Sequence, residues 1–258
     1  MTPLFPIIGI AFVFGACIGS FLNVCIYRIP AGTSIVRPPS SCPRCKNEIA
    51  FYDNIPILSW LLLLGKCRAC GAPIAVRYPL VELMTGLFAA ACIVFFGPTW
   101  HALAAFAFIA VLIVVAFIDL DHRIIPDAIS LPGIPIFFIA AIAATDLTWQ
   151  SSVVGVLAGG GSLFAVAWGY QTITGREGMG GGDIKLLAMI GAFIGWRGIL
   201  FTLFAASAIG TLIGIVAMIR SGKGMKLAIP FGPFLALGAV LYLFFGVPIF
   251  HWYFGMLR

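Results

Sequence analysis

The sequence predicts an all-α polytopic membrane protein with about eight transmembrane helices and one small cytoplasmic loop that resembles a zinc ribbon. Three observations lead to this prediction. Hydrophobic residues make up 62% of the 258 residues and charged residues only 9%, which is far from the balance of a soluble domain. The apolar residues gather in long runs separated by short charged segments. Four cysteines form two close pairs in the one sizeable segment that is not mainly apolar.

Eight apolar segments approach the length of about 20 residues that a helix needs to cross the hydrocarbon core. The sixth segment, of about a dozen residues, is short for a crossing, which leaves open a full span or a re-entrant or tilted half-span. The N-terminal segment has no basic region before it, so we expect a retained first span. In order, the predicted spans are Leu4 to Tyr27, Leu80 to Phe96, Ala102 to Leu120, Ala128 to Ala144, Val153 to Ile173, Ile184 to Gly195, Ile199 to Ile219 and Ile229 to Phe250.

The basic residues predict the orientation of these spans. The net charge of +6 would suggest a nucleic-acid partner in a soluble chain, but here the charges lie between apolar runs, so we expect membrane lipid and no nucleic acid. If the first loop is cytoplasmic, every Lys and Arg except Arg197 and Arg258 lies on the cytoplasmic side, as the positive-inside rule requires. Both chain ends are then expected outside the cytoplasm.

The loop at residues 29–79 carries the motifs Cys42-x-x-Cys45 and Cys67-x-x-Cys70. Two such pairs present four thiolates in the tetrahedral geometry that zinc prefers, and a closed shell of four cysteines is typical of a structural site. Redox chemistry or disulfides are the alternative, but stable disulfides are rare in a reducing cytoplasm. The loop is too small to bury much of a core, so we expect the metal to hold its shape.

Acidic residues lie at the ends of two predicted spans. Asp119 directly follows the apolar run of the third span, and Asp183 begins the sixth span after the glycine run Gly180, Gly181 and Gly182. An ionisable group at membrane depth is by default a functional candidate. Asp183 has a second interpretation as a helix N-cap. In the predicted topology both residues lie at the cytoplasmic boundary, so we expect them to meet in the fold.

Two carboxylates in a poorly solvated site do not both ionise easily, so one keeps a proton while the other stays charged. That state favours aspartic-protease chemistry, in which the ionised acid activates water and the protonated acid polarises a peptide carbonyl. The glycines before Asp183 would let an extended substrate lie against it, which makes Gly180, Gly181 and Gly182 candidate substrate-binding residues. Lys185 is a further candidate substrate-binding residue, and it either favours the ionised form of Asp183 or extends to lipid phosphate.

Together these motifs resemble the prepilin peptidases. The resemblance takes in the cysteine loop with the following Arg77 to Glu82, the element from Phe117 to Asp127, and Gly180 to Asp183. It also includes Gly15, Gly19, Ser20, Phe21, Asn23 and Val24 in the first span, so it covers nearly the whole chain.

The resemblance implies a bifunctional inner-membrane enzyme of type IV pilus or type II secretion systems. It implies a GXGD aspartic endopeptidase that removes the leader of prepilins or pseudopilins on the cytoplasmic side, then methylates the new N-terminal amine with S-adenosylmethionine. Asp119 and Asp183 would be its catalytic acids, and Cys42, Cys45, Cys67 and Cys70 the ligands of a structural Zn²⁺. Residues 1–28 would form the first transmembrane helix, 29–79 the zinc loop and 80–258 the transmembrane protease domain.

Glu82, just inside the second span, is our hypothesis for the residue that holds the amine or the donor's sulfonium during methyl transfer. Its alternative role is a salt bridge with Arg77 at the membrane edge. A membrane transporter or ion pathway with a structural zinc loop is the alternative function, but the acids gather at one face and form no relay across the bilayer. A zinc-dependent scaffold or redox sensor without hydrolysis would leave the glycine run unexplained. The sequence predicts neither the oligomeric state nor the particular pilin substrates.

Overall fold

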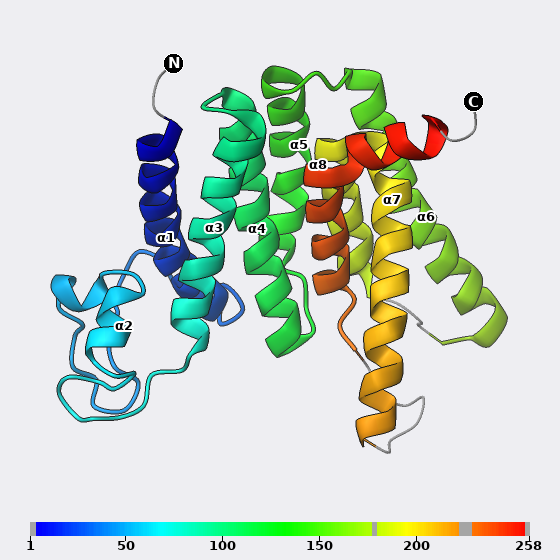
Figure 1. Ribbon diagram of the computed structural model, residues 1–258. Coiled ribbons are helices and arrows are strands. Elements are labelled where there is room, and N and C mark those ends of the chain that lie inside the picture. Colours follow the sequence, from blue (N-terminus) through cyan, green and yellow to red (C-terminus); the bar gives the residue numbers. More distant parts are fainter. Residues whose placement is uncertain (1–3, 177–179, 222–228, 256–258) are drawn as a thin grey trace. The chain divides into compact units, whose positions relative to one another are not determined.

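A computed structural model describes residues 4–176, 180–221 and 229–255. These residues form helices and two isolated β-bridges, and no strand occurs among them (Figure 1). The chain divides into two compact units, Met1–Val114 and Val115–Arg258. The helices are α1 (Leu4–Arg28), the 3₁₀ helix η1 (Phe51–Asn54), α2 (Leu58–Leu62), α3 (Arg77–Phe96), α4 (Trp100–His122), α5 (Asp127–Ala144), α6 (Trp149–Thr174), α7 (Gly181–Ser221) and α8 (Gly232–Gly255).

In the first unit, α1 packs closely along α3 (Figure 1). Glycines make the close approach possible: a Cβ atom on Gly19 would lie 2.7 Å from Glu82 Cα, and one on Gly86 would lie 2.9 Å from the Phe12 carbonyl oxygen. Small residues at helix contacts are the usual way for apolar helices to pack in lipid, where no hydrophobic effect drives them together. The loop between α1 and α3 holds η1, α2 and the cysteine pairs.

In the second unit, α6 and the first part of α7 cross in antiparallel directions. The Ser152 hydroxyl donates a hydrogen bond to the Ala192 carbonyl, and further along Gly155 faces Gly191 and Gly159 faces Leu187. A methyl group added to Gly155 or Gly191 would overlap the other residue's carbonyl oxygen. The backbones therefore touch, and no larger residue fits at this crossing.

The predicted spans agree with the helices in most places. In the part of the chain that the structure describes, six helices are long and apolar enough to cross a membrane, and Gly232–Gly246 forms a shorter apolar helix, which fits a multi-pass membrane protein. The sixth and seventh predicted spans are joined in α7, where Gly195 has non-helical angles (φ 72°, ψ 178°) that separate them. The eighth begins at Gly232, three residues after its predicted start at Ile229.

The sixth predicted span, which is short for a full crossing, runs alongside α5 from one end to the other. At its beginning, Gly182 lies beside Ile125, which precedes α5; at its end, Gly195 lies beside Leu147 and Ser151, which follow α5. Although it is short, this segment connects the same two ends of the second unit as α5 does. The break at Gly195 then lets the rest of α7 form a separate helix.

Candidate active site and metal site

Asp119 lies in the last turn of α4 and is buried, with 5% of its surface exposed. The backbone N–H of Gly232, the first residue of α8, donates a hydrogen bond of 3.0 Å to its Oδ2 atom. Among the residues that the structure describes, this is the only hydrogen bond to the Asp119 side chain, so Oδ1 has no such partner there.

Asp183 lies in the first turn of α7, and its carboxylate is close enough to Asp119 for the two charges to interact. Its Oδ1 atom is buried and has no hydrogen-bond partner in the described part of the chain. Because α7 begins at Gly181, Asp183 lies inside the helix and is not its N-cap. Its negative charge still lies at the positive end of the helix dipole. The structure thus brings the two predicted acids together and leaves a buried oxygen of Asp183 without a partner among the described residues.

Ile125 packs between the start of α7, which carries Asp183, and the start of α8, which binds Asp119. A Cβ atom on Gly182 would lie 2.9 Å from Ile125 Cβ, and one on Gly232 would lie 3.3 Å from Ile125 Cδ1. Gly182 is therefore required by packing. Around Gly180 and Gly181, in contrast, an added Cβ would meet nothing within 4 Å. This open space is compatible with the predicted contact to substrate, which stays a prediction.

Lys185 forms an ion pair with Asp127, the first residue of α5. Its Nζ atom lies 2.7 Å and 2.8 Å from the two carboxylate oxygens of Asp127. Both side chains are partly exposed, so the pair contributes little to stability. In this geometry the Lys185 ammonium is directed to Asp127, and its predicted role in substrate binding would require it to leave that partner.

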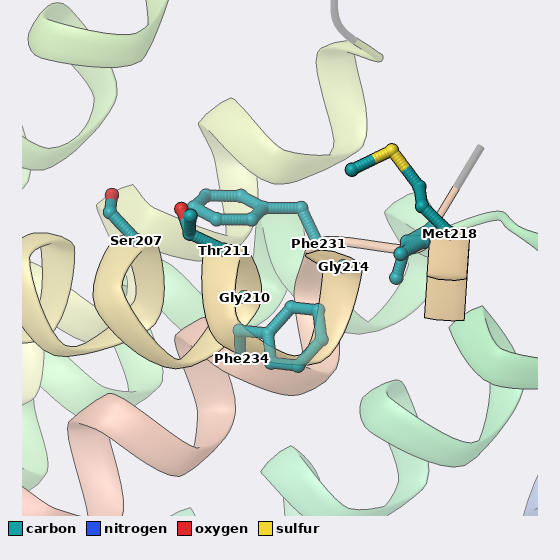
Figure 2. Close-up of a pocket in the computed structure, with 8 residues that line it drawn as sticks. Ser207, Gly210, Thr211, Gly214, Met218, Phe231 and Phe234 are labelled. Carbon is teal, nitrogen blue, oxygen red and sulfur yellow. The ribbon is translucent and has the colours of Figure 1, made fainter. Parts of the chain in front are cut away.

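A hollow of about 410 Å³ lies between α7 and the start of α8. Figure 2 shows the rings of Phe231 and Phe234 against the α7 segment that carries Gly210. Since Phe231 precedes Gly232, the hollow is next to the residue that binds Asp119. Its lining consists of Ser207, Gly210, Thr211, Gly214, Met218, Ile229, Phe231 and Phe234.

The first unit contains the predicted cysteine cluster. The Sγ atoms of Cys42, Cys45, Cys67 and Cys70 all lie within 4.8 Å of one another, and those of Cys42 and Cys70 are 3.8 Å apart. A tetrahedral zinc site with Zn–S bonds of about 2.3 Å needs sulfur atoms about 3.8 Å apart. The four thiols therefore fit one tetrahedral metal ion.

The two cysteine pairs have the same backbone structure. Lys46 N donates to Cys42 O in the first and Gly71 N donates to Cys67 O in the second. Each turn is closed by an isolated β-bridge, Ser41 to Glu48 and Lys66 to Pro73. The residue after the second cysteine has a left-handed backbone in both, with φ 59° at Lys46 and φ 68° at Gly71. Such turns direct both cysteines and nearby N–H groups toward one point.

Local groups prepare the loop for a cation and hold its shape. Backbone N–H groups of Cys45 and then Arg44 lower the pKa of the Cys42 thiol to about 6, so a thiolate forms there readily. The Arg68 guanidinium donates to both oxygens of Asp53 at 2.8 Å and 2.6 Å. This hydrogen bonding, helped by the positive charge, holds the pKa of Asp53 below its usual value.

Glu82, the candidate for methyl transfer, is buried in α3 with 9% of its surface exposed. Its Oε2 atom accepts a 2.7 Å hydrogen bond from the backbone N–H of Ile57, the residue before α2. Ile57 has a positive φ of 63° with ψ −52°, which is costly for a β-branched residue. Glu82 therefore fixes the cysteine loop to α3. Its role in methyl transfer stays a prediction.

The sequence analysis missed Gly232, whose N–H is the hydrogen-bond partner of Asp119. A signal was present, because Pro230-Phe231-Gly232-Pro233 places a glycine between two prolines just before an apolar segment. A proline is tolerated in the first turn of a helix, where its missing N–H costs no hydrogen bond. That pattern predicts a helix beginning there, but it does not indicate which distant side chain the free N–H would meet.

Comparison with known proteins identifies relatives for both units. Residues 13–96 match the family model described as the bacterial peptidase A24 N-terminal domain, and residues 105–215 match the type IV leader peptidase family. No solved structure matches significantly.

Several proteins named prepilin leader peptidase/N-methyltransferase are similar to this chain. That of Aeromonas hydrophila is 37% identical over 269 residues, covering 95% of this chain and 93% of the relative. That of Pseudomonas aeruginosa is 36% identical, covering 90% and 88%. That of Myxococcus xanthus is 43% identical over 86% of this chain, which spans 65% of that relative's length.

Proposed function

Because this chain belongs to the type IV leader peptidase family, we propose that it is a bifunctional membrane enzyme that cleaves prepilin leaders and N-methylates the new N-terminus. Relatives with both activities in their names cover most of its length. The single observation that carries the peptidase proposal is the meeting of two acids from α4 and α7, with a buried Asp183 oxygen that has no partner in the described residues.

Asp119 and Asp183 are the catalytic acids in this proposal. The ionised carboxylate takes a proton from water while the water oxygen bonds to the peptide carbonyl carbon. The protonated carboxyl donates a hydrogen bond to the carbonyl oxygen as negative charge develops there, then gives its proton to the leaving nitrogen as the C–N bond breaks. Both acids lie at helix ends in the second unit, which suits a peptide arriving from the membrane boundary better than ions crossing the bilayer.

Cys42, Cys45, Cys67 and Cys70 hold a structural Zn²⁺ in this proposal. The observed Sγ separations suit its tetrahedral geometry. When bound, a zinc ion with four thiolates stabilises the loop fold and has no open position for water. The repeated turns of the loop direct the four sulfur atoms toward one point.

Methyl transfer uses S-adenosylmethionine as donor. A new α-amine titrates near pH 8, so an appreciable fraction is already nucleophilic at neutral pH and mainly needs orientation. S-adenosylmethionine would supply the methyl group to the amine nitrogen, and the amine would then lose a proton to solvent. Glu82 is the proposed residue that holds the amine or the sulfonium, and a Glu82→Gln variant that methylates at the normal rate would remove it from the mechanism.

The proposed location is the bacterial inner membrane, with the acids and the cysteine loop on the cytoplasmic side. The distribution of Lys and Arg between the spans supports this orientation. The proposed substrates are prepilins or pseudopilins, delivered from the lipid phase. Residues 1–28 form the first span, 29–79 the zinc loop and 80–258 the protease domain in this assignment.

The test is cleavage of a prepilin by the purified protein in detergent, with Asp119→Asn and Asp183→Asn made separately. Each variant should lose at least about 100-fold in rate, because each removes one half of the acid–base pair. Metal content should be unchanged. Asp146→Asn is the matched control, since this exposed aspartate follows α5 away from both acids. Retained cleavage in either active-site variant would exclude the proposed mechanism.

A second assay supplies labelled S-adenosylmethionine and a pilin whose leader has already been removed. Asp119→Asn and Asp183→Asn should transfer the methyl group at the wild-type rate, because the acids serve only the first reaction. A wild-type protein that cleaves the prepilin but transfers no label would limit the function to proteolysis.

A further inference from the structure

The N-terminus of α8 meets the carboxylate of Asp119. Gly232 is the first residue of this helix, and its N–H donates to Oδ2 of Asp119 in a buried hydrogen bond across 113 sequence positions. The first N–H groups of a helix have no partner within the helix and carry its partial positive charge. This donor is thus available for a carboxylate, and it is directed at one particular oxygen.

Space explains why this residue is glycine. A Cβ atom at position 232 would lie 2.7 Å from Asp119 Oδ2 and 3.3 Å from its Cγ atom. The backbone of Gly232 is not in the left-handed region, so other residues could adopt its conformation. Any side chain would instead push the carboxylate away from the N–H that binds it. The close approach of backbone to carboxylate is therefore the feature that requires glycine here.

We infer that Gly232 is a positioning residue for the acid pair, whose N–H holds Oδ2 of Asp119 and leaves Oδ1 for water and substrate. This inference rests on the proposed peptidase function. The Phe231 carbonyl, in the same peptide unit as this donor, accepts from two N–H groups, those of Phe234 and Leu235, so it stays in place when only one of them is lost. A donor fixed before the reaction pays no reorganisation cost when charge moves, and a small misplacement of a reacting group is costly.

The sharpest test removes the donor without adding atoms. Glycolic acid, incorporated in place of Gly232, changes its N–H to an ester oxygen and keeps the small backbone. Loss of one hydrogen bond to a charged group should lower kcat for prepilin by about tenfold to a hundredfold. KM should stay within about twofold, because the bond orients a reacting group and does not bind the ground-state substrate.

The matched control is the same change at Phe234, made with its α-hydroxy analogue. It removes an N–H from the same turn, but that N–H donates to the Phe231 carbonyl and not to Asp119. The control should keep kcat close to wild type. A second variant, Gly232→Ala, keeps the donor and displaces the carboxylate, and should lower kcat by about a hundredfold. Its control is Gly169→Ala in α6, where an added Cβ meets nothing within 4 Å.

These outcomes separate the inference from the function on which it rests. If the wild type does not cleave prepilin, the peptidase function is wrong. If the wild type cleaves and the Gly232 ester does so with unchanged kcat, the positioning role is overturned. An equal loss in the Phe234 control would overturn it as well, since the effect would then come from the stability of the turn. Melting temperature and metal content should stay at wild-type values in the Gly232 ester.

Discussion

The cysteine loop and the acid pair are built in opposite ways. The four metal-binding candidates lie within one loop, in two turns that repeat the same hydrogen bonds. The acid pair depends on three separate segments: the end of α4, the start of α7 and the start of α8. The loop is therefore specified by local spacing, whereas the acid pair exists only after distant helices have packed.

This difference predicts how each region responds to damage. The loop has little apolar core of its own, so its shape depends on ligands that act together. The acid pair is held by helix packing, in which glycines let the α6 and α7 backbones touch. Replacing metal ligands in the loop should therefore remove its fixed structure almost completely. Enlarging a residue at the helix contacts should destabilise the protein in proportion to the added volume.

The largest expected effect follows replacement of one cysteine in each turn, Cys42→Ser together with Cys67→Ser. Loss of two thiolates should abolish stoichiometric zinc, because structural sites use four ligands. Without metal the loop should lose its fixed structure, which hydrogen exchange over residues 29–79 would show as loss of protection. Helices α5 to α7 should keep their protection from exchange, since their packing does not use the metal.

Cys17→Ser is the control for this pair of changes. Cys17 is exposed on α1 and does not belong to the cluster, so zinc content should equal that of the wild type. Full zinc content in the double variant, measured by elemental analysis, would show that the four cysteines are not the ligands.

The second largest effect is expected at the crossing of α6 with the first part of α7, the part that carries Asp183. In Gly155→Ala the new methyl group would overlap the Gly191 carbonyl oxygen, and a backbone atom cannot move aside as a side chain can. Overpacking of this kind costs roughly 1–3 kcal/mol, occasionally more. Melting in detergent should shift downward, and cleavage should fall because the same part of α7 carries Asp183. Zinc content should be unchanged.

Gly161→Ala separates packing from helix propensity in that experiment. Gly161 is also in α6, but an added Cβ there meets nothing within 4 Å. Alanine is a better helix former than glycine by about 1 kcal/mol, so this control should be neutral or slightly more stable. Equal melting temperatures for Gly155→Ala and wild type would mean that the α6–α7 contact is looser than the structure describes.

The sequence predicted the features that depend on local spacing, such as the cysteine loop, better than those that depend on the packing of distant helices. Apolar runs located the spans, and the predicted end of the sixth span at Gly195 coincides with the break that separates the two parts of α7. Cysteine spacing predicted the cluster, since the ligands of a metal knuckle are close in sequence. The contact between Gly232 and Asp119 was not predictable, because it involves a backbone N–H that every residue except proline has. Only the packing of α8 decides which carboxylate it meets.

The smallest effect compares the two cysteine turns with each other. Lys46 and Gly71 occupy equivalent positions with a left-handed backbone, and this conformation costs a residue with a side chain about 1 kcal/mol or more. Glycine avoids that cost but loses more entropy on folding. Lys46→Gly should therefore raise zinc affinity by no more than about fivefold.

Gly71→Ala should lower zinc affinity, and it tests the cost of the left-handed backbone alone. An added Cβ at Gly71 meets nothing within 4 Å, so no clash contributes to the result. Zinc affinity, measured by competition with a chelator, should fall by about fivefold to tenfold. If Gly71→Ala instead bound zinc as tightly as the wild type, the left-handed turn would not be what aligns the second pair of cysteines. The left-handed backbone at Lys46 would then cost no binding energy, and Lys46→Gly would not raise zinc affinity.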